Sequence, residues 1–381
     1  MASPGRELVL TGMGLSDWLH LMGRCQWHRT PKYWPRMARL TVQSVLNEGM
    51  GWEEERQLGP LIDAQTVQDP LFVLGCWRSG TTWLHRMLAQ DPQLAAPTTA
   101  QVFNPHTFFF LQGSLPGRRA RLGRRLYQVW VGLNWGQKMS GWQRPSDAME
   151  AGPNLPGEDE IALLMMGRSD LMAQLLGPNL AKHYQRYLNL QTLDEKARDD
   201  WKKHWFRFLQ KLTLRYAPRT LVLKSPNHTA RMRTLLEIFP KARFLHIHRH
   251  PFEVYRSFTR HLQRTAEVGD LLQDRNSDPA QTCLRLYDEV YSAFLEDRPR
   301  IPAGQLHEIG FEALERDPIG QLSQAYQNLG LPDFERFLPP LKAYLDATAH
   351  YRKTDFAALD PATKTTIRQH WGRYFEAFGY D

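Results

Sequence analysis

The sequence predicts an α/β fold with a central, mainly parallel sheet. Three short apolar runs have the length of buried strands: Leu71 to Leu74, Thr220 to Lys224 and Ala242 to His248. Each run is followed by a loop and then by a segment with helical periodicity. This alternation of strand and helix is typical of a single α/β domain in which helices cover both faces of the sheet.

The first of these units is the most informative about function. Leu71 to Leu74 leads into a glycine-bounded loop, Gly75 to Gly80, and then into a helix predicted from Thr81 to about Gln90. Such a junction gathers backbone N–H groups and the positive end of the helix dipole, so it can hold a phosphate. The spacing nearly matches the loop of nucleotide triphosphatases, but Thr81 stands where that pattern has its lysine. The mismatch argues against a kinase or a triphosphatase, and the cation of this loop is Arg78 instead.

The second and third strands also end in residues suited to phosphate. Thr220 to Lys224 runs into Pro226, which opens a predicted helix that reaches about Pro240. Arg249 directly follows the third strand, and Ser257 lies on the next predicted helix. An arginine can donate two parallel hydrogen bonds to a phosphate, and a hydroxyl can complete the contact. Because ligands of such sheets lie beyond the carboxyl ends of the strands, these residues are expected to meet the glycine-bounded loop.

The loop itself resembles a known phosphosulfate site. Arg78-Ser79-Gly80-Thr81-Thr82-Trp83 after an apolar strand is similar to the 5′-phosphosulfate loop of sulfotransferases, which use 3′-phosphoadenosine-5′-phosphosulfate (PAPS). In that family an arginine at the end of a strand and a serine eight residues later hold the 3′-phosphate, and Arg249 and Ser257 match this spacing. Two half-sites in the expected order make the resemblance specific.

Three further segments extend the resemblance. Pro156-Gly157-Glu158-Asp159-Glu160 is similar to the Pro-x-Glu-Asp-Glu segment of the large bacterial-type branch. Phe311-Glu312-Ala313-Leu314 resembles the family's Tyr-Glu-Asp-Leu segment, with Phe and Ala as departures. His350-Tyr351-Arg352-Lys353 resembles the segment that closes over the 3′-phosphate, which implies cofactor contacts from Arg352 and Lys353.

The resemblance implies a P-loop-like three-layer fold and a division of the chain. Residues 69–381 are expected to form the sulfotransferase domain, with a large helical insertion at about 103–215 that shapes the acceptor side. Residues 1–68 are expected to form a helical N-terminal extension. The part beyond about residue 261 is predicted to be mostly helical, with Pro332 and the pair Pro339-Pro340 as breakers.

The resemblance also implies in-line transfer of a sulfuryl group from PAPS to a hydroxyl. As in phosphoryl transfer, the enzyme mainly positions the groups and stabilises charge on the leaving phosphate. Arg78 and Lys224 are the expected catalytic cations, with the lysine at the bridging oxygen. No aspartate follows the third strand, where triphosphatases hold magnesium, so a metal-free mechanism is expected. The expected cofactor contacts are Arg78, Ser79, Gly80, Thr81, Thr82, Trp83, Arg249, Ser257, Arg352 and Lys353.

For Trp83, stacking on the adenine and packing in the core are both left open. The acceptor hydroxyl also needs a general base. His228, four residues after Lys224, has an imidazole of suitable pKa and is preferred on the expectation that it faces the strand ends. Glu158 and Glu160 are the alternatives, since other branches of the family use a glutamate; they could equally be acids that stabilise a helix N-terminus.

The composition is typical of a globular protein and limits the kinds of partner that are expected. The chain has 381 residues, of which 42% are hydrophobic, and no apolar run long enough to span a membrane. Its start lacks the pattern of a signal peptide and its three cysteines are too few for a disulfide framework, so a cytoplasmic location is expected. No Cys/His spacing suggests a metal site, and His246, His248 and His250 are expected to be structural. No motif for nucleic-acid binding is present, so no nucleic-acid partner is expected.

The net charge of +8 has two interpretations. One is a basic surface with a pocket for a polyanionic cofactor. The other is peripheral contact with an anionic membrane, since a cluster of arginines precedes an apolar stretch from Leu126 to Val131 and Tyr33 to Met50 has a similar mixture. The arginines are Arg118, Arg119, Arg121, Arg124 and Arg125. Helices packed on the core are preferred over the membrane interpretation.

Three functions remain open at this point. A PAPS-dependent sulfotransferase is the leading hypothesis, and the aromatic insertion favours a hydroxyl on an apolar or lipid-like acceptor over a bare sugar. A non-catalytic nucleotide-binding protein on the same fold is the alternative. A P-loop kinase-like phosphotransferase is disfavoured by Thr81 and by the missing magnesium ligand.

Overall fold

The computed structural model describes residues 10–24, 31, 34–135, 152–172, 178–268, 278–350 and 358–381. At its centre lies a five-stranded sheet in the order β2-β3-β1-β4-β5, in which every strand is parallel to its neighbours. The strands are β1 Leu71–Leu74, β2 Leu94–Ala95, β3 Thr220–Lys224, β4 Arg243–His248 and β5 Leu306–Gly310. The prediction of an α/β fold with a parallel sheet is therefore confirmed.

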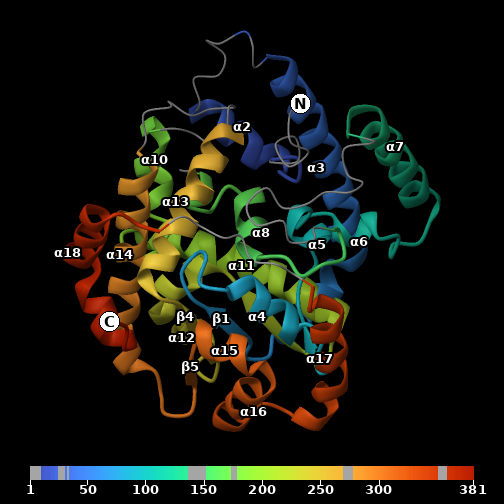
Figure 1. Cartoon of the computed structure of the whole chain (residues 1–381). Helices are drawn as coiled ribbons and strands as arrows, with labels where there is room; N and C mark the ends of the chain where they lie inside the picture. The colour runs from blue at the N-terminus through green and yellow to red at the C-terminus, as the bar shows by residue number, and fades with distance from the viewer. Residues whose placement is uncertain are drawn as a thin grey trace.

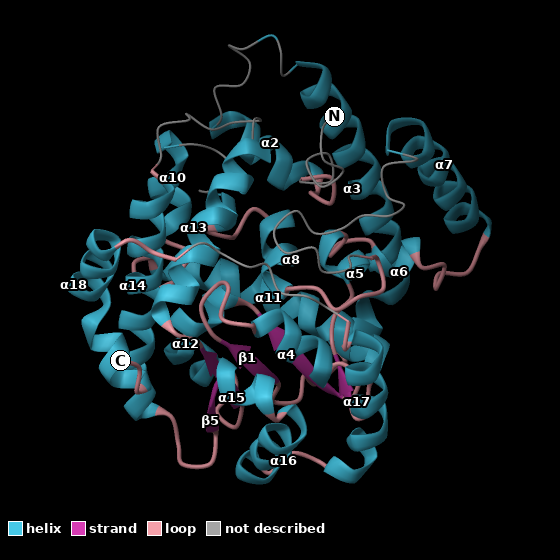
Figure 2. Cartoon of the chain, in the orientation of Figure 1, coloured by secondary structure: helices cyan, strands magenta, loops and turns pink. Residues whose placement is uncertain are grey.

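Helices surround this sheet on both sides (Figures 1 and 2). Those before β3 are α2 Leu15–Arg24, α3 Trp34–Asp63, α4 Thr81–Leu88, α5 Thr99–Phe103, α6 Phe108–Leu111, α7 Arg118–Trp135, α8 Asp159–Met165, α10 Pro178–Gln185 and α11 Glu195–Tyr216. Those after β3 are the 3₁₀-helix η4 Pro226–Ala230, α12 Met232–Ile238, α13 Pro251–Val268, α14 Pro279–Asp297, the 3₁₀-helix η5 Arg298–Arg300, α15 Phe311–Arg316, α16 Pro318–Leu329, α17 Phe334–Thr348 and α18 Pro361–Phe378.

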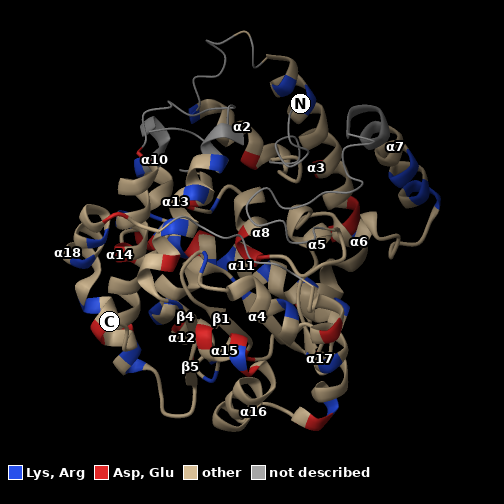
Figure 3. Cartoon of the chain, in the orientation of Figure 1, with Lys and Arg blue, Asp and Glu red and all other residues tan. Residues whose placement is uncertain are grey.

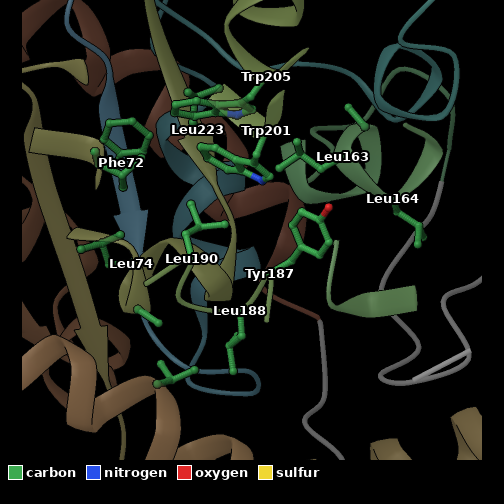
Figure 4. Close-up of a cluster of buried hydrophobic side chains, with 14 of the residues drawn as sticks. Phe72, Leu74, Leu163, Leu164, Tyr187, Leu188, Leu190, Trp201, Trp205 and Leu223 are labelled. Atoms are coloured by element: carbon green, nitrogen blue, oxygen red, sulfur yellow. The ribbon is translucent and has the colours of Figure 1, made fainter. Parts of the chain in front are cut away.

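The alternation of side chains along the strands divides the core into two layers. Leu71 and Val73 of β1 pack with α4, α15, α16 and α17 on one face of the sheet. Phe72 and Leu74 point to the other face, where they pack with α8, α11, α12, α13, α14 and α18. Figure 4 shows part of this second layer, with Trp205 of α11 close to Phe72. Because all four residues of β1 are buried, the strand has the continuous apolar sequence of a central parallel strand.

The N-terminal helices pack on the same core. Trp18 of α2 and Leu40 of α3 are buried in the second layer, and the Trp18 indole Nε1 donates a hydrogen bond to Thr41 Oγ1 at 2.9 Å. Within the described part of 103–215 the regular elements are all helices, as predicted. The boundary between an N-terminal extension and a sulfotransferase domain stays a prediction. No helix in the described part of the chain combines the length and the apolar composition needed to cross a membrane.

The structure corrects three sequence-based expectations about elements. The short strand β2 and the edge strand β5 were not predicted. The helix predicted from Pro226 to Pro240 is two elements, η4 and α12, separated at Arg231. The pair Pro339-Pro340 does not break a helix but lies inside α17, whereas Pro332 does fall between α16 and α17.

Candidate active site

The sheet register brings the three predicted strand ends together. β1 lies between β3 and β4, with Val73 opposite Lys224 and Leu74 opposite His246. The loop after β1, the last residue of β3 and the residue after β4 therefore share one edge of the sheet. Ligands of parallel α/β sheets bind at this edge.

The loop from Gly75 to Gly80 has a backbone that side chains would disrupt. Gly75 has φ +141° and Gly80 has φ +101°, and Arg78 also lies at positive φ, 70°. A Cβ on Gly75 would lie 2.4 Å from the Ile247 carbonyl oxygen, and one on Gly80 would lie 2.4 Å from the Phe311 ring. The loop is therefore closely packed, and Gly80 is the N-cap of α4, so the loop presents the start of that helix.

The two predicted half-sites for the cofactor meet at Arg78. Arg78 lies on the loop after β1 and Ser257 lies on α13. The Arg78 Nε donates a hydrogen bond to Ser257 Oγ at 2.9 Å. The Arg249 guanidinium approaches the Arg78 carbonyl oxygen at 3.5 Å. Arg78, Arg249 and Ser257 thus form one group of two guanidinium cations and a hydroxyl. This arrangement fits a ligand with more than one phosphate-like anion.

The Arg249 guanidinium is fixed by neighbouring side chains, but one of its hydrogen-bond donors has no partner among the described residues. Its guanidinium carbon lies 4.4 Å from the centre of the Phe311 ring, and Nη2 lies 3.8 Å from a carboxylate oxygen of Glu253. Burial lowers the pKa of the guanidinium from its ordinary value. Its buried Nε has no hydrogen-bond partner among the described residues. A buried, unpaired donor of this kind calls for an acceptor, and an anionic ligand would supply one.

A second cluster lies at the end of β3. The Lys224 ammonium forms an ion pair with Glu158 and lies 3.3 Å from Thr82 Oγ1. The lysine side chain is 2% exposed, whereas that of Glu158 is 24% exposed. Thr82 belongs to the first turn of α4, so this pair adjoins the glycine-bounded loop. A buried cation and an accessible carboxylate therefore lie side by side at the predicted phosphosulfate site.

The remaining loop residues have separate surroundings. Ser79 is fully buried and its hydroxyl donates to the Cys76 carbonyl oxygen at 2.7 Å, so this side chain braces the loop. Thr81 is buried at the start of α4. Trp83 is half-buried and its ring lies edge-on to Phe311 at 6.1 Å, the same ring that contacts Arg249.

The structure does not bring His228 to the strand ends. Its imidazole is fully buried between Phe72 and Trp205, at ring distances of 5.4 and 5.5 Å. Nε2 forms a hydrogen bond with Asp159 Oδ2 at 2.7 Å. The expectation that His228 faces the site is therefore wrong. The physical reason is that the chain after Pro226 forms a 3₁₀ turn rather than an α-helix, and this turn directs the ring into the core.

Glu160 is likewise enclosed. Its carboxylate accepts hydrogen bonds from the Arg231 guanidinium at 2.6 and 3.1 Å and from Ser169 Oγ at 2.5 Å. Both partners of the Glu160–Arg231 pair are buried, with side chains at most 1% exposed. Of the three candidates for the general base, Glu158 is the one that lies beside the loop and reaches solvent.

Sequence reasoning missed the residues that anchor the segment around Glu158. Asp159 accepts hydrogen bonds from His228 and from the Trp205 indole, and Arg231 donates to Glu160 and to the Tyr187 and Leu188 carbonyl oxygens. The sequence signal that could have indicated them was the unusual run of three acids, Glu158 to Glu160, at the start of an otherwise apolar helix. Acids that are buried with such a helix need hydrogen-bonding or charged partners. The partners themselves come from elements distant in the sequence.

Three histidines and two basic residues complete the predicted set. His246 is buried and bonded to Glu308 at 3.0 Å, His248 Nδ1 is bonded to the Tyr380 hydroxyl at 2.9 Å, and His250 Nδ1 accepts a hydrogen bond from the Phe252 N–H at 3.2 Å. Burial lowers the pKa of His248 to about 4. Arg352 and Lys353 lie outside the described residues. Within those residues, no group of three or more His, Cys, Asp or Glu side chains is arranged to hold a metal ion.

Comparisons with known proteins agree on one family. A family model described as "Sulfotransferase family" matches residues 70–336. Two curated relatives, the omega-hydroxy-beta-dihydromenaquinone-9 sulfotransferases Stf3 of Mycobacterium bovis and of Mycobacterium tuberculosis, are each 30% identical over 372 residues, which is 97% of this chain and 90% of the relative.

Solved structures agree on the fold. The sulfotransferase STF9 from Mycobacterium avium superposes with a TM-score of 0.66 at 17% identity, over 91% of this chain and 86% of its own. The sulfotransferase STF1 from Mycobacterium tuberculosis H37Rv superposes with a TM-score of 0.64 at 18% identity, over 91% and 85% of the two chains. At these identities the superpositions show likeness of fold alone.

Proposed function

This chain belongs to the sulfotransferase family, and we propose that it moves a sulfuryl group from PAPS to the hydroxyl of a lipid-like alcohol. The observation that carries the proposal is the meeting of Arg78, Arg249 and Ser257 beside the Lys224–Glu158 pair. The sequence places these residues in segments far apart, and the fold gathers them at one edge of the sheet.

The described residues fit PAPS as the donor. The loop from Gly75 to Gly80 offers backbone N–H groups and a helix start to the 5′-phosphosulfate. Arg249, with its unpaired buried Nε, and Ser257 offer donors to the 3′-phosphate. Trp83 contacts the Phe311 ring, which Arg249 also contacts, and is proposed to stack on the adenine. When bound, PAPS supplies an activated sulfuryl group attached to a phosphate leaving group.

Two cations have the proposed task of stabilising charge. The Lys224 ammonium adjoins Thr82 at the helix start, where it would donate a hydrogen bond to the bridging oxygen of the leaving phosphate. Arg78 would neutralise the same phosphate from within the loop. Lys224 is nearly enclosed by protein, so its charge acts in a medium that screens it less than water does. No step of this proposal uses a metal.

Glu158 is proposed as the general base. Its carboxylate is the accessible member of its ion pair, so an acceptor hydroxyl can reach it. It would take the proton from that hydroxyl at a carboxylate oxygen while the adjacent Lys224 meets the leaving group. His228 and Glu160 lack such access because both side chains are enclosed by protein. In place of catalysis, they are proposed to position the segment that carries Glu158.

The acceptor is proposed to be an apolar alcohol. The relatives of 30% identity act, by their name, on an omega-hydroxylated dihydromenaquinone, a lipid with a hydroxyl. The alignment covers 97% of this chain, so the region of residues 103–215, which we propose shapes the acceptor side, has a counterpart in that relative. We therefore expect a terminally hydroxylated menaquinone to be a much better substrate than a simple sugar. Equal kcat/KM values for the two alcohols would contradict this choice.

The donor is tested by thermal unfolding with nucleotides. Adenosine 3′,5′-bisphosphate is expected to raise the melting temperature without magnesium, because a ligand that binds the native state alone stabilises it. ATP is expected to do so far less. Equal stabilisation by ATP, or a requirement for magnesium, would favour a kinase-like enzyme. Stabilisation by the bisphosphate with no turnover of PAPS would favour a non-catalytic nucleotide-binding protein.

A further inference from the structure

Helix α7 has two faces of different character. Its inner face, formed by Ala120, Gly123 and Tyr127, packs against α3 and α6: Ala120 is buried, and a Cβ on Gly123 would lie 2.9 Å from the Phe110 ring. Burial raises the pKa of the Tyr127 hydroxyl to about 12. The helix is therefore seated on the protein along this face, and Figure 1 shows it at the periphery of the molecule, beyond α6.

The outer face of α7 is an apolar stripe. Leu122, Leu126 and Val129 follow the i, i+4, i+7 spacing of one helix face, and their exposed fractions are 60%, 60% and 59%. Monomeric proteins in water seldom expose three large aliphatic side chains in one row. Exposed apolar patches of this kind mark contact surfaces. We call this row the α7 stripe.

Arginines border the stripe on both sides. By helical position, Arg118, Arg121 and Arg125 lie along one side of the stripe and Arg119 lies along the other, and all four are exposed. The helix carries no acidic residue, and Figure 3 shows a row of basic positions along it. An apolar row flanked by arginines matches the bilayer interface, where acyl chains lie beneath anionic headgroups.

Helix α3, which contacts α7 through its buried side, exposes a second apolar row on its outer side. Trp34, Val42, Val45 and Trp52 share one helix face by their spacing and are between 43% and 63% exposed. Met50 of α3 and Ala120 of α7 belong to one buried cluster, so the two helices are neighbours. Among the described residues, the most exposed large apolar side chains lie on α2, α3 and α7.

We propose that α7, through the α7 stripe and its flanking arginines, docks the protein on an anionic lipid bilayer. A second copy of the chain fits this surface less well. A symmetric contact through α7 would place arginine rows against each other, and the helix has no carboxylate to compensate them. Anionic headgroups supply the opposite charge. This inference goes beyond the proposed function and does not depend on it.

The test is flotation of the full chain with vesicles. The protein is expected to bind vesicles of phosphatidylcholine with phosphatidylglycerol about tenfold or more better than vesicles of phosphatidylcholine alone, and added salt should weaken the binding. A stripe variant (Leu122→Ser, Leu126→Ser, Val129→Ser) and an arginine variant (Arg118→Gln, Arg121→Gln, Arg125→Gln) should each lose about tenfold or more of it.

A matched control removes equal charge elsewhere. Arg300→Gln, Arg316→Gln and Arg336→Gln change exposed arginines near β5, α15 and α17 and should leave vesicle binding unchanged. Unaltered melting temperatures would show that the variants fold. Failure of the native chain to bind, or binding by either α7 variant equal to the control, would overturn the proposal. So would a stripe variant that turns an oligomer into a monomer while vesicle binding persists. Vesicle binding needs no turnover, so this outcome is separate from that of the proposed sulfuryl transfer.

Discussion

Three consecutive acids, Glu158, Asp159 and Glu160, have three different environments. Glu158 pairs with Lys224 and is accessible, Asp159 is bonded to His228, and Glu160 is enclosed with an arginine. Burial by itself would raise the pKa of Asp159, but the His228 ring and the Trp205 indole outweigh it, so that the pKa is lowered. The surroundings of each carboxylate, and not the residue type, therefore decide which of the three acids is the candidate base.

If Glu158 is the base, Glu158→Gln should lower the chemical rate about 10²-fold or more. Glutamine keeps an acceptor for Lys224 but cannot take a proton. Affinity for PAPS should be nearly unchanged, because the loop and Arg249 remain. Single-turnover kinetics at saturating PAPS would measure the chemical step directly.

His228→Asn is the matched comparison for Glu158→Gln. Asparagine removes the buried ring, and loss of the hydrogen bond to Asp159 should cost about 1–3 kcal/mol of stability. The chemical rate of the folded fraction should fall far less than in Glu158→Gln, because His228 is proposed to position the segment and not to take the proton. A normal rate in Glu158→Gln together with an inactive, folded His228→Asn would reverse the two assignments.

Arg249 is expected to be specific for the 3′-phosphate. Arg249→Ala should weaken PAPS binding by roughly 2 kcal/mol or more, the order expected when a charged hydrogen-bond partner is lost. The effect should nearly vanish for an analogue without the 3′-phosphate. Calorimetric titration of both ligands would decide it, and an equal loss for both would assign Arg249 to the other phosphate.

Asp170 should make stability depend on pH. Burial, and then the charge of Glu160, raise the pKa of this carboxyl to about 7 in the folded chain. In the unfolded chain, Asp170 releases its proton near the ordinary pKa of an aspartate. The stabilisation that protonated Asp170 gives to the folded chain is therefore fully present below that pKa and is lost as the pH rises towards about 7.

Asp170→Asn cannot ionise and keeps an oxygen for the Asn227 amide, its partner in the native chain. The variant's melting temperature should therefore rise relative to that of the native chain between about pH 5 and pH 8. A difference that stays constant over this interval would mean that Asp170 titrates normally.

Among the elements, the loop between β1 and α4 depends most on its backbone. Gly80→Ala would place a Cβ against Phe311 at positive φ, which should cost about 1–3 kcal/mol of stability and remove the stabilisation by adenosine 3′,5′-bisphosphate.

Gly49→Ala on α3 is the control, since a Cβ there meets nothing within 4 Å. It should stabilise the protein by about 0.5–1 kcal/mol. Melting curves with and without the nucleotide would show both effects; unchanged nucleotide binding in Gly80→Ala would refute the role of the loop.

The predictability of an element followed the strength of its local pattern. The central strands β1, β3 and β4 were predicted within one residue because continuous apolar runs occur where both faces are covered. The edge strand β5, Leu306–Gly310, is half-exposed and mixes polar with apolar residues, so it lacked that signal. Pro339 and Pro340 are tolerated in α17 because Phe337 and Leu341 anchor the helix in the core, and such packing overrides local propensity.

At the scale of the whole molecule, the meeting of the three proposed cofactor residues could be predicted and the burial of His228 could not. Arg78, Arg249 and Ser257 follow strands, and parallel strands end at one edge, so their meeting follows from topology. The orientation of His228 depends on a 3₁₀ turn and on Asp159, which lies 69 residues away in the sequence. Contacts of that kind arise from tertiary packing, and a local pattern does not reveal them.

The most direct test is sulfuryl transfer by the purified protein. It would be incubated without magnesium with PAPS carrying labelled sulfate and with a terminally hydroxylated menaquinone in detergent. The label is expected to appear in a sulfate ester of the menaquinone, in amounts equal to the adenosine 3′,5′-bisphosphate released, and Lys224→Ala should abolish it. Tight binding of the bisphosphate while the label stays in PAPS, with this alcohol and with simple long-chain alcohols alike, would contradict the proposed function.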